Sequence, residues 1–352
     1  MSKTKKLFIP LLSLIITASL FNGCNKTPTV KDSPSNEPLS KTEFFMGTVV
    51  SISLYDKKDD KILEKAFNKV KQIESELSIN KEGTEIDKVN NAAGKEAVKV
   101  SKDAFINIEK GLEYSNLTEG SFDITIGPLV KLWSIGLPEA KVPTEEEINK
   151  TKPLVGYKDL EINKSDNTVK LKKPGMKIDL GGIAKGYTAD AITDILKENG
   201  VEHALVDLGG NIYALGNNPE GRPWKIGVQN PFDSRGKIVG YVPVENKSVV
   251  TSGIYERYIE KDGKKYHHIL NPFTGYPYDN EIAGITIISD KSIDGDALST
   301  SVFSKGLEGG MKFIEKLPNI EAVFVTKDYK VYITSGLKDT FKLSNDEFKQ
   351  QN

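Results

Sequence analysis

The stretch of sequence that decides the fold is Ile178-Asp179-Leu180-Gly181-Gly182-Ile183-Ala184-Lys185-Gly186, just past the middle of the chain. It predicts a short strand over Ile178 to Leu180, a glycine turn, and then a helix from about Ala184 to Glu198. Gly200 is expected as the C-cap of this helix, and a second strand follows over Ala204 to Asp207. Strand, turn, helix and strand therefore follow one another without a long connection.

Before this stretch, helices and strands occur in an irregular order. Apolar residues at helical spacing predict a helix over Asp60 to Leu77, and Ser101 is placed to cap another over Ala104 to Leu117. Phe44 to Tyr55 has the β-branched and aromatic composition of a strand. Pro138 to Tyr157 is expected to be a charged, helical excursion.

After this stretch, most of the expected elements are short. Strands are expected over Ile212 to Leu215, Lys225 to Val228, Val249 to Thr251, Tyr255 to Ile259 and Gly284 to Ile288. A helix over Asp296 to Leu307 follows, and two further strands, Ala322 to Val325 and Lys330 to Ile333, form a final hairpin. This irregular mixture of helices and short strands indicates an α+β fold.

The composition is that of an ordinary globular protein. The chain has 352 residues with a formal net charge of −1, and 38% of them are hydrophobic and 28% charged. A charge so near zero gives no general attraction to nucleic acid. Because Cys24 is the only cysteine, a disulfide within the chain and a cysteine-based metal cage are both excluded.

The first residues have the layout of a secretory signal. Three lysines near the start precede the apolar run Leu7 to Phe21, which is shorter than the roughly twenty residues of a membrane-spanning helix. The run ends at Phe21-Asn22-Gly23-Cys24, which resembles a lipobox with Phe21 where leucine is usual. This predicts cleavage before Cys24 and attachment of diacylglycerol to its thiol. The alternative is an uncleaved anchor helix with an incidental cysteine.

Three segments are therefore expected along the chain. Residues 1–23 form the signal peptide, and residues 24–40 form a flexible tether, because Asn25 to Ser40 is too polar to bury a core. The folded domain is expected over residues 41–345.

Residues 178–186 also carry the features of a nucleotide site. Asp179 is a carboxylate at the expected strand end, the two glycines permit a close approach of the backbone, and a helix N-terminus favours phosphate. Lys185 is placed to reach a phosphate oxygen. The spacing is that of neither a P-loop nor the dinucleotide fingerprint, and an ordinary strand-to-helix turn is the alternative.

Two further segments combine acidic residues with turns or helix starts. Val206 to Asn211 ends a strand with Asp207 and two glycines, and this is either a site or a tight turn. In Asp294-Gly295-Asp296-Ala297-Leu298-Ser299-Thr300, Asp296 and Thr300 are four apart and share one face of a helix. Their oxygens suit magnesium beside phosphates. The alternative is a helix capped by Asp294 with a buried threonine.

The last two segments offer a base and a flat binding surface. Tyr266 to Pro272 contains His267 and His268, which face opposite ways on a strand, so at most one points into a given site. That histidine is a general base or a structural residue. Gly120 to Val130, followed by Leu132-Trp133, is suited either to holding a flat heterocycle or to core packing.

Together and in this order, these segments closely resemble the ApbE family, the FAD:protein FMN transferases. The matching pieces are Phe45-Met46-Gly47-Thr48, Glu76-Leu77-Ser78, Glu85-Ile86, Asn90, Phe122-Asp123-Ile124-Thr125, Asp179 to Gly186, Val206 to Asn211, Thr251-Ser252-Gly253, His267-His268-Ile269 and Asp296 to Thr300. The resemblance covers about residues 43 to 335. It implies one ApbE-like domain of mixed helices and mostly antiparallel sheet.

The resemblance also implies site residues. Mg²⁺ would be held by Asp296, Thr300 and a backbone carbonyl that we place at Gly182. FAD is expected to contact Met46, Asn80, Ser121, Phe122, Asp123, Asp179, Lys185, His268 and Ile269. The family often has a tyrosine where this chain has Asn80, which predicts only modest affinity for FAD. His268 is the expected general base, with Asp296 as a competitor.

The implied reaction is the Mg²⁺-dependent transfer of FMN from FAD to a threonine hydroxyl of another protein, which forms a phosphoester and releases AMP. Such chemistry depends on charge neutralisation and positioning. The acceptor would be a membrane-associated redox subunit with a Ser/Thr-Gly-Ala-Thr-like motif. The enzyme would be lipid-anchored to the outer face of the bacterial cytoplasmic membrane. A Mg²⁺-dependent FAD pyrophosphatase and a non-catalytic flavin-binding lipoprotein are the alternatives.

Overall fold

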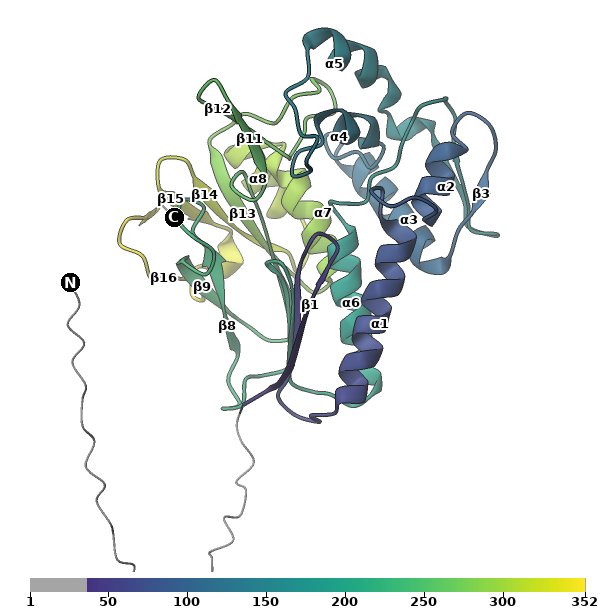
Figure 1. The fold of residues 1–352 in the computed structure, drawn as a ribbon. Coiled ribbons are helices and arrows are strands. Elements are labelled where there is room, and N and C mark those ends of the chain that lie inside the picture. Colours follow the sequence, from purple (N-terminus) through teal and green to yellow (C-terminus); the bar gives the residue numbers. More distant parts are fainter. Residues whose placement is uncertain (1–36, 352) are drawn as a thin grey trace, which may run out of the picture. The chain divides into compact units, whose positions relative to one another are not determined.

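The computed structural model describes residues 37–351, so the predicted signal peptide, Cys24 and most of the predicted tether lie outside the described residues. The described chain is built on a nine-stranded sheet (Figure 1) with the order β1-β2-β6-β7-β10-β13-β14-β15-β17. Its strands are β1 (Leu39–Phe45), β2 (Thr48–Leu54), β6 (Ala204–Leu208), β7 (Asn211–Leu215), β10 (Lys247–Gly253), β13 (Ile282–Ser289), β14 (Glu321–Thr326), β15 (Lys330–Ile333) and β17 (Lys349–Gln350). Neighbouring strands are antiparallel except β15 and β17, which confirms the mostly antiparallel sheet.

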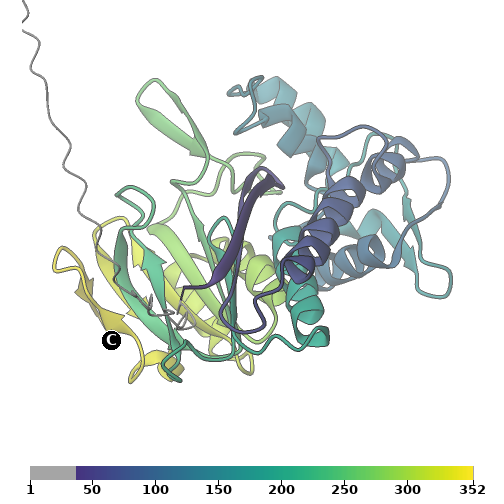
Figure 2. The same ribbon diagram turned by 60° about the horizontal axis from the view of Figure 1, so that its bottom comes forward.

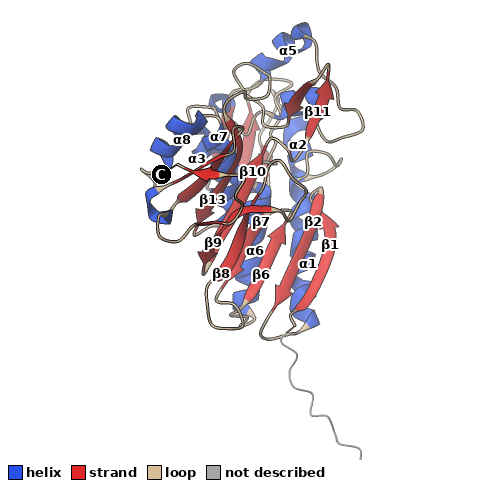
Figure 3. Cartoon of the chain, turned by 90° about the vertical axis from the view of Figure 1, so that its left-hand side faces the viewer, coloured by secondary structure: helices blue, strands red, loops and turns tan. Residues whose placement is uncertain are grey.

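Helices cover one face of this sheet. They are α1 (Asp60–Leu77), α6 (Ala184–Glu198), α7 (Ser292–Phe303) and α8 (Gly306–Ile314). In Figure 3 the strands lie in front of α1 and α6, and Figure 2 shows the purple β1–β2 hairpin beside α1. Apolar side chains of α1 and α6, such as Phe67 and Ile192, pack against Ile52 and Val206 of the sheet. This burial is the main force that holds the helical layer on the sheet.

A smaller sheet covers part of the opposite face. It consists of β8 (Trp224–Gln229), β9 (Ile238–Val244) and β16 (Lys342–Leu343). Trp224 and Val228 of this small sheet share a buried apolar cluster with Val249 and Val331 of the large one. The molecule therefore has three layers, with the nine-stranded sheet in the middle, as an α+β domain requires.

The remaining elements lie at one end of the helical layer and around the pocket described below, except the 3₁₀ turn Ser335–Leu337, which packs beside β14 and the small sheet. They are α2 (Glu85–Asn91), α3 (Lys102–Leu117), α4 (Gly127–Trp133), α5 (Glu145–Thr151), the sheet of β3 (Val98–Lys99), β5 (Thr168–Leu171) and β4 (Leu160–Asn163), the hairpin of β11 (Tyr258–Lys261) and β12 (Lys264–His267), and the 3₁₀ turns η1 (Lys152–Leu154), η2 (Tyr157–Asp159) and η3 (Ser335–Leu337). Within residues 37–351, no helix combines the length and apolar character needed to cross a membrane.

Several predicted elements have the bounds that the sequence indicated. Helix α1 spans Asp60–Leu77, and α6 spans Ala184–Glu198. Ser101 caps α3, because its side chain accepts a hydrogen bond from Ala104 N at 3.1 Å. Gly200 follows the α6 cap residue with φ of +72°, the left-handed conformation that glycine adopts without strain.

Other predictions were wrong in extent. Residues 44–55 are not one strand but the end of β1, a turn at Met46 and Gly47, and β2, because Met46 and Gly47 have φ of 53° and 69°. Residues 138–157 are helical only in α5 and in short 3₁₀ turns, since Pro143 and Pro153 interrupt the segment. The strand predicted over 255–259 begins at Tyr258.

The two segments that bear most on the site also differ from their predictions. Ile178 to Leu180 is extended but is not a strand; Lys177 makes a single bridge with Ile126, and Asp179 N bonds Ile124 O at 2.8 Å. The helix predicted over 296–307 begins earlier, at Ser292, and breaks before Gly306, where α8 begins. The strands of the folded domain also extend beyond residues 41–345 at both ends, since β1 starts at Leu39 and β17 ends at Gln350.

Helices α6 and α7 approach each other closely at Gly186. A Cβ atom added at Gly186 would lie 2.3 Å from the carbonyl oxygen of Ser292 and 2.7 Å from Cα of Ile293. Real Cβ atoms are not found at such distances from backbone atoms, so glycine is required here. The absence of a side chain at Gly186 sets how near the two helices lie.

We therefore expect Gly186→Ala to destabilise the protein by about 1–3 kcal/mol, because the added methyl must push the α7 backbone away. The measurement is the free energy of unfolding from a denaturant titration. Gly309→Ala in α8 is the matched control, since its Cβ would meet only Lys305 Cβ at 3.3 Å and alanine favours a helix. Equal stabilities for Gly186→Ala and the parent would contradict this account of the contact.

Candidate active site

One pocket brings together most of the residues that the sequence predicted for the site. Its walls come from the α3–α4 link, the start of α6, helix α7 and the segment after β12. The predicted residues that line it are Ser121, Phe122, Asp123, Asp179, Gly182, Lys185, His268, Ile269, Asp296 and Thr300. Segments that are far apart in sequence thus meet around one cavity.

Helices α6 and α7 cap each other: a carboxylate of each helix accepts hydrogen bonds from backbone N–H groups at the N-terminal end of the other. Asp296 Oδ2 of α7 accepts a hydrogen bond from Gly186 N of α6 at 2.9 Å. Asp190 of α6 accepts from Ser292 N at 2.8 Å and from Ile293 N at 3.0 Å in α7. Neither cap residue makes a side-chain capping bond of its own, so these carboxylates satisfy N–H groups that a helix start leaves unpaired.

The first turn of α7 is also tied to α3. The N-cap of α7 is Lys291, so Asp294 is not the cap that one interpretation of the sequence allowed. Instead, Asp294 Oδ1 accepts from the Tyr114 hydroxyl at 2.8 Å and lies 3.1 Å from Lys110 Nζ. Bonds from α6 and from α3 therefore hold α7 in place.

Asp296 is the buried anionic group of the pocket. Its side chain is only 4% exposed, and its Oδ1 lies 3.1 Å from Lys185 Nζ. With Gly186 N on the other oxygen, the carboxylate is held in one orientation at the positive end of α6. Such a group attracts and positions a cation together with an anionic substrate.

The predicted magnesium ligands lie side by side. Thr300 follows Asp296 by one turn of α7, and a Cβ added at Gly182 would lie 3.6 Å from Thr300 Oγ1. A carboxylate, a hydroxyl and a backbone carbonyl are the hard oxygen donors that Mg²⁺ prefers, so the residues fit this ion. Within residues 37–351, no group of three or more His, Cys, Asp and Glu side chains could hold a metal ion. The protein would therefore supply few ligands, and phosphate or water would supply the rest.

The two adjacent histidines have different environments. His267 is buried; its Nε2 lies 2.7 Å from Tyr278 O and its Nδ1 accepts from Ile269 N at 3.3 Å, so it is a structural residue. His268 lines the pocket, and its Nδ1 lies 3.3 Å from Arg257 O. A carbonyl only accepts, so Nδ1 carries the proton and the lone pair is on Nε2.

Burial keeps His268 uncharged. Desolvation lowers the pKa of His268 to about 3, and the positive charge of Arg257 acts in the same direction. The imidazole is therefore neutral at physiological pH, and Nε2 is free to accept a proton. This is the protonation state that a general base requires, but so low a pKa makes Nε2 a weak proton acceptor unless a bound anion raises its pKa.

Asp123 and Asp179 line the pocket but are largely engaged locally. Asp123 accepts from Thr125 N and Thr125 Oγ1, both at 2.7 Å, and from Tyr157 N at 2.9 Å. Asp179 Oδ1 accepts from Gly181 N at 2.6 Å. Burial raises the pKa of both carboxyl groups, and these hydrogen bonds oppose that rise. The bonds of Asp123 shape the loop, whereas one oxygen of Asp179 remains for a ligand.

Two residues that were predicted to contact FAD lie outside the pocket lining. Met46 is part of the β1–β2 turn, where its N–H bonds Glu74 Oε1 at 2.7 Å and its side chain packs between two core clusters. Asn80 is exposed, and its Oδ1 accepts from Lys131 Nζ at 2.7 Å. The positions of Met46 and Asn80 depend on contacts with residues distant in the sequence, which the local sequence pattern does not predict.

The segment Val206 to Asn211 is a tight turn and not part of the pocket. Strands β6 and β7 pair antiparallel, and Gly209 and Gly210 form the two-residue loop with φ of 68° and 96°. Asp207 Oδ1 accepts from Gly210 N at 2.7 Å and closes the loop. The turn interpretation was therefore right for this segment.

The pocket also contains residues to which the sequence gave no role. Arg257 precedes β11, and Ser252 belongs to β10, where its hydroxyl lies 2.7 Å from that of Ser299. The rarity of arginine in this chain is a feature of the sequence that could have drawn attention to Arg257. The chain has only three arginines, Arg222, Arg235 and Arg257, among 48 lysines and arginines.

Comparison with known proteins gives a consistent result. The sequence model of the ApbE family matches residues 46–324. The chain is 38% identical to the FAD:protein FMN transferase of Klebsiella pneumoniae, over 85% of this chain and 93% of that protein. It is 32% identical to that of Treponema pallidum, over 88% and 90%.

Solved structures agree with the sequence comparison. The ApbE protein from Thermotoga maritima is similar with a TM-score of 0.79 at 32% identity, covering 86% of this chain and 99% of that one. The flavin transferase ApbE from Vibrio cholerae gives a TM-score of 0.78 at 29% identity, with coverage of 86% and 99%.

The reciprocal caps predict an unusual pH dependence. Burial raises the pKa of Asp190 to about 6 from an ordinary value of 3.8, so the folded state binds this proton more tightly than the unfolded chain. The contribution of Asp190 to stability therefore falls as pH rises from about 4 to 6. Asp190→Asn should remove this trend, and the free energy of unfolding of the parent minus that of the variant should drop by about 2–3 kcal/mol between pH 4 and 7.

The matched control is Asp194→Asn, an exposed residue on the same helix, which should leave the pH dependence of the parent unchanged. Urea titrations at several pH values measure all three proteins. A free energy of unfolding of the parent, minus that of Asp190→Asn, that rises or stays constant from pH 4 to 7 would contradict the assignment.

Proposed function

Because the chain belongs to the ApbE family and is an enzyme of the flavin transferase type, we propose that it cleaves FAD and attaches the FMN half to a threonine hydroxyl of an acceptor protein. The threonine oxygen attacks the phosphorus on the FMN side, the diphosphate bond breaks, and AMP leaves. The product is a phosphoester between FMN and the acceptor. The hydroxyl proton passes to a base of the enzyme.

The observation that carries this proposal is the meeting of Asp296, Lys185 and His268 in one pocket. Asp296 and Lys185 form an ion pair at the start of α6, where the positive helix end favours phosphate oxygens. His268 presents a neutral nitrogen to the same cavity. The pocket thus combines groups for an anion with a group that removes a proton.

We assign the magnesium site to Asp296, Thr300 and the carbonyl of Gly182. Asp296 provides the single negative charge of this set, and Thr300 lies next to the Gly182 backbone. When bound, Mg²⁺ would neutralise charge on the diphosphate and stabilise the charge that develops as the bond breaks.

His268 is our preferred general base. Its Nε2 lone pair is free, because Nδ1 is bonded to the carbonyl of Arg257. Both oxygens of the competitor, Asp296, already accept hydrogen bonds from Lys185 and Gly186. Asp296 is therefore better suited to charge balance than to proton transfer.

The acceptor and the location follow from the sequence predictions. We propose a membrane-associated redox protein with a Ser/Thr-Gly-Ala-Thr-like motif as the acceptor. We also propose that Cys24 is lipidated and anchors the enzyme to the outer face of the bacterial cytoplasmic membrane.

The function is tested with Asp296→Asn, which keeps the shape of the side chain and an oxygen for Gly186 N but removes the charge. Purified enzyme, FAD, Mg²⁺ and an acceptor peptide are mixed, and covalent FMN is measured by mass and AMP by chromatography. We expect both products to fall together by roughly 10³-fold or more, about 4 kcal/mol. Thr300→Ala should be milder, because water can replace a neutral hydroxyl.

A thermal melt shows whether these variants are folded. FAD binding in EDTA should survive both changes, since the flavin contacts lie elsewhere in the pocket. Folded Asp296→Asn protein that still cleaves FAD at the parental rate would rule out our assignment of the metal site. AMP without covalent FMN from the parent would indicate a pyrophosphatase.

The anchor is tested with Cys24→Ser. If Cys24 is the lipidated residue, the variant should appear in the soluble fraction or remain as an uncleaved precursor, because no thiol is available for the lipid. Membrane fractionation and intact mass measure this. The same mature mass and partitioning in variant and parent would show that the lipoprotein interpretation is wrong.

A further inference from the structure

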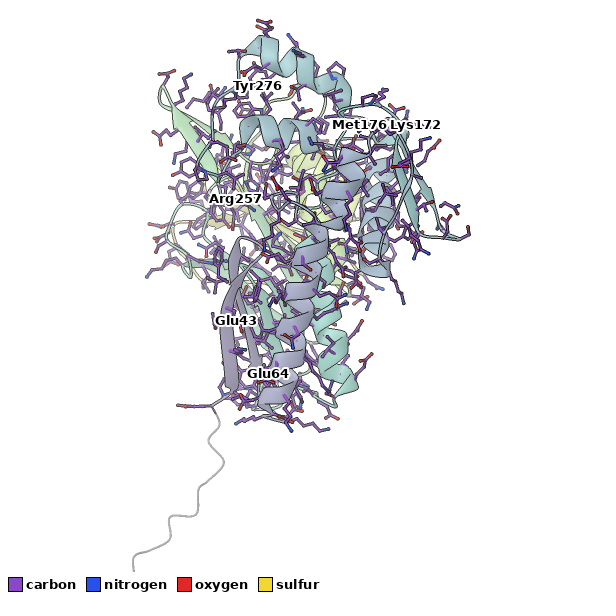
Figure 4. All side chains as sticks on the ribbon, turned by 45° about the vertical axis from the view of Figure 1, so that its right-hand side comes forward. Glu43, Glu64, Lys172, Met176, Arg257 and Tyr276 are labelled. Atoms are coloured by element: carbon purple, nitrogen blue, oxygen red, sulfur yellow. The ribbon has the colours of Figure 1, made fainter. Side chains whose placement is uncertain are left out.

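Arg257 occupies an unusual place in the pocket. It ends the link between β10 and β11, and its carbonyl oxygen accepts from His268 N at 3.1 Å and lies 3.3 Å from His268 Nδ1. In Figure 4 it lies above the tip of the β1–β2 hairpin, which carries Glu43, and below Tyr276. The Arg257 backbone therefore positions His268, and its side chain is available for another role.

The side chain of Arg257 packs against the link between α4 and α5. A Cβ added at Gly136, in the link between α4 and α5, would lie 2.8 Å from Arg257 Cδ and 3.4 Å from Cγ. Gly136 is exposed and has φ of +91°, a conformation that glycine adopts without strain. The aliphatic part of the arginine thus lies against Gly136, while the residue itself lines the pocket.

The guanidinium has no partner within residues 37–351. It takes part in no hydrogen bond or ion pair there, although Arg257 lines the pocket. Its charge is near enough to oppose the rise that burial causes in the pKa of Asp179 and to add to the fall in the pKa of His268. The ion pairs of the described chain are otherwise made by lysine, apart from that of Arg222 with Glu220. An unpaired arginine in a lysine-rich chain has its five donors free for a ligand.

We propose that Arg257 binds the phosphate on the FMN side of the flavin nucleotide. This inference rests on the proposed function. A planar guanidinium donates two parallel hydrogen bonds to phosphate oxygens, which an ammonium does not. The phosphoryl group that is transferred must lie beside His268 Nε2, and Arg257 is the residue bonded to the other side of that imidazole.

Lys185 and the start of α6 line the same pocket and would contact the same diphosphate. Arg257 therefore selects flavins that carry a phosphate, and it keeps its contact with FMN after AMP has left. The part of the residue that holds His268 is the backbone, so a side-chain substitution separates phosphate binding from the positioning of the imidazole.

The experiment measures binding of riboflavin, FMN and FAD, without metal or acceptor, to the purified protein by flavin fluorescence. Arg257→Gln should weaken binding of FMN and FAD by roughly 10- to 100-fold and leave riboflavin binding unchanged. Arg257→Lys should lie between the parent and Arg257→Gln, because it keeps the charge but loses the paired donors. Arg222→Gln, outside the pocket lining, is the matched control and should bind all three flavins like the parent.

Equal weakening for all three flavins in folded Arg257→Gln protein would overturn the proposal and assign the side chain to packing against Gly136. Unchanged binding of FMN and FAD would overturn it as well, while leaving the transferase proposal intact. A parent protein that binds no flavin would refute both. Loss of FMN binding in Arg257→Gln would support the proposal even if the enzyme hydrolysed FAD instead of transferring FMN.

Discussion

Helices α6 and α7 approach each other so closely at Gly186 that a single methyl group would collide with the α7 backbone. Within this contact, Asp296 satisfies the start of α6 and Asp190 satisfies the start of α7. Each of these two buried carboxylates lies at the positive end of the neighbouring helix, which offsets part of the cost of its burial. The position of Thr300, of the glycine turn and of Lys185 all follow from this one arrangement.

The pocket combines a cation that is paired, a cation that is unpaired within residues 37–351 and a neutral histidine. Lys185 is held by Asp296, whereas Arg257 is held only by the packing of its aliphatic chain. Burial keeps His268, which lines the same pocket, neutral. A site of this kind stabilises an anionic diphosphate with little movement of its own groups, and it still offers a base for an incoming hydroxyl. The three-layered fold supplies the rigidity that such positioning requires.

The sequence by itself determined the features that depend on neighbours along the chain. Helix bounds such as those of α6 follow from apolar spacing and from Gly200, and the shared face of Asp296 and Thr300 follows from the helical repeat. The loop at Gly209 and Gly210 was visible as a turn for the same reason. These local rules were enough to indicate an α+β fold, and the order of the segments indicated the family, whose resemblance implied the mostly antiparallel sheet.

Tertiary structure alone decided which side chains meet. Asp294 bonds Tyr114 instead of capping α7, and Asn80 bonds Lys131 outside the pocket, because helices distant in sequence bring these partners together. The segment before Gly181 is not part of a sheet. It is held by a hydrogen bond from Asp179 N to Ile124 O and by a single bridge between Lys177 and Ile126. Arg257 lines the pocket with its aliphatic chain against Gly136, where a Cβ atom would lie only 2.8 Å from its Cδ. Sequence periodicity describes one element at a time, whereas these contacts depend on how separate elements pack.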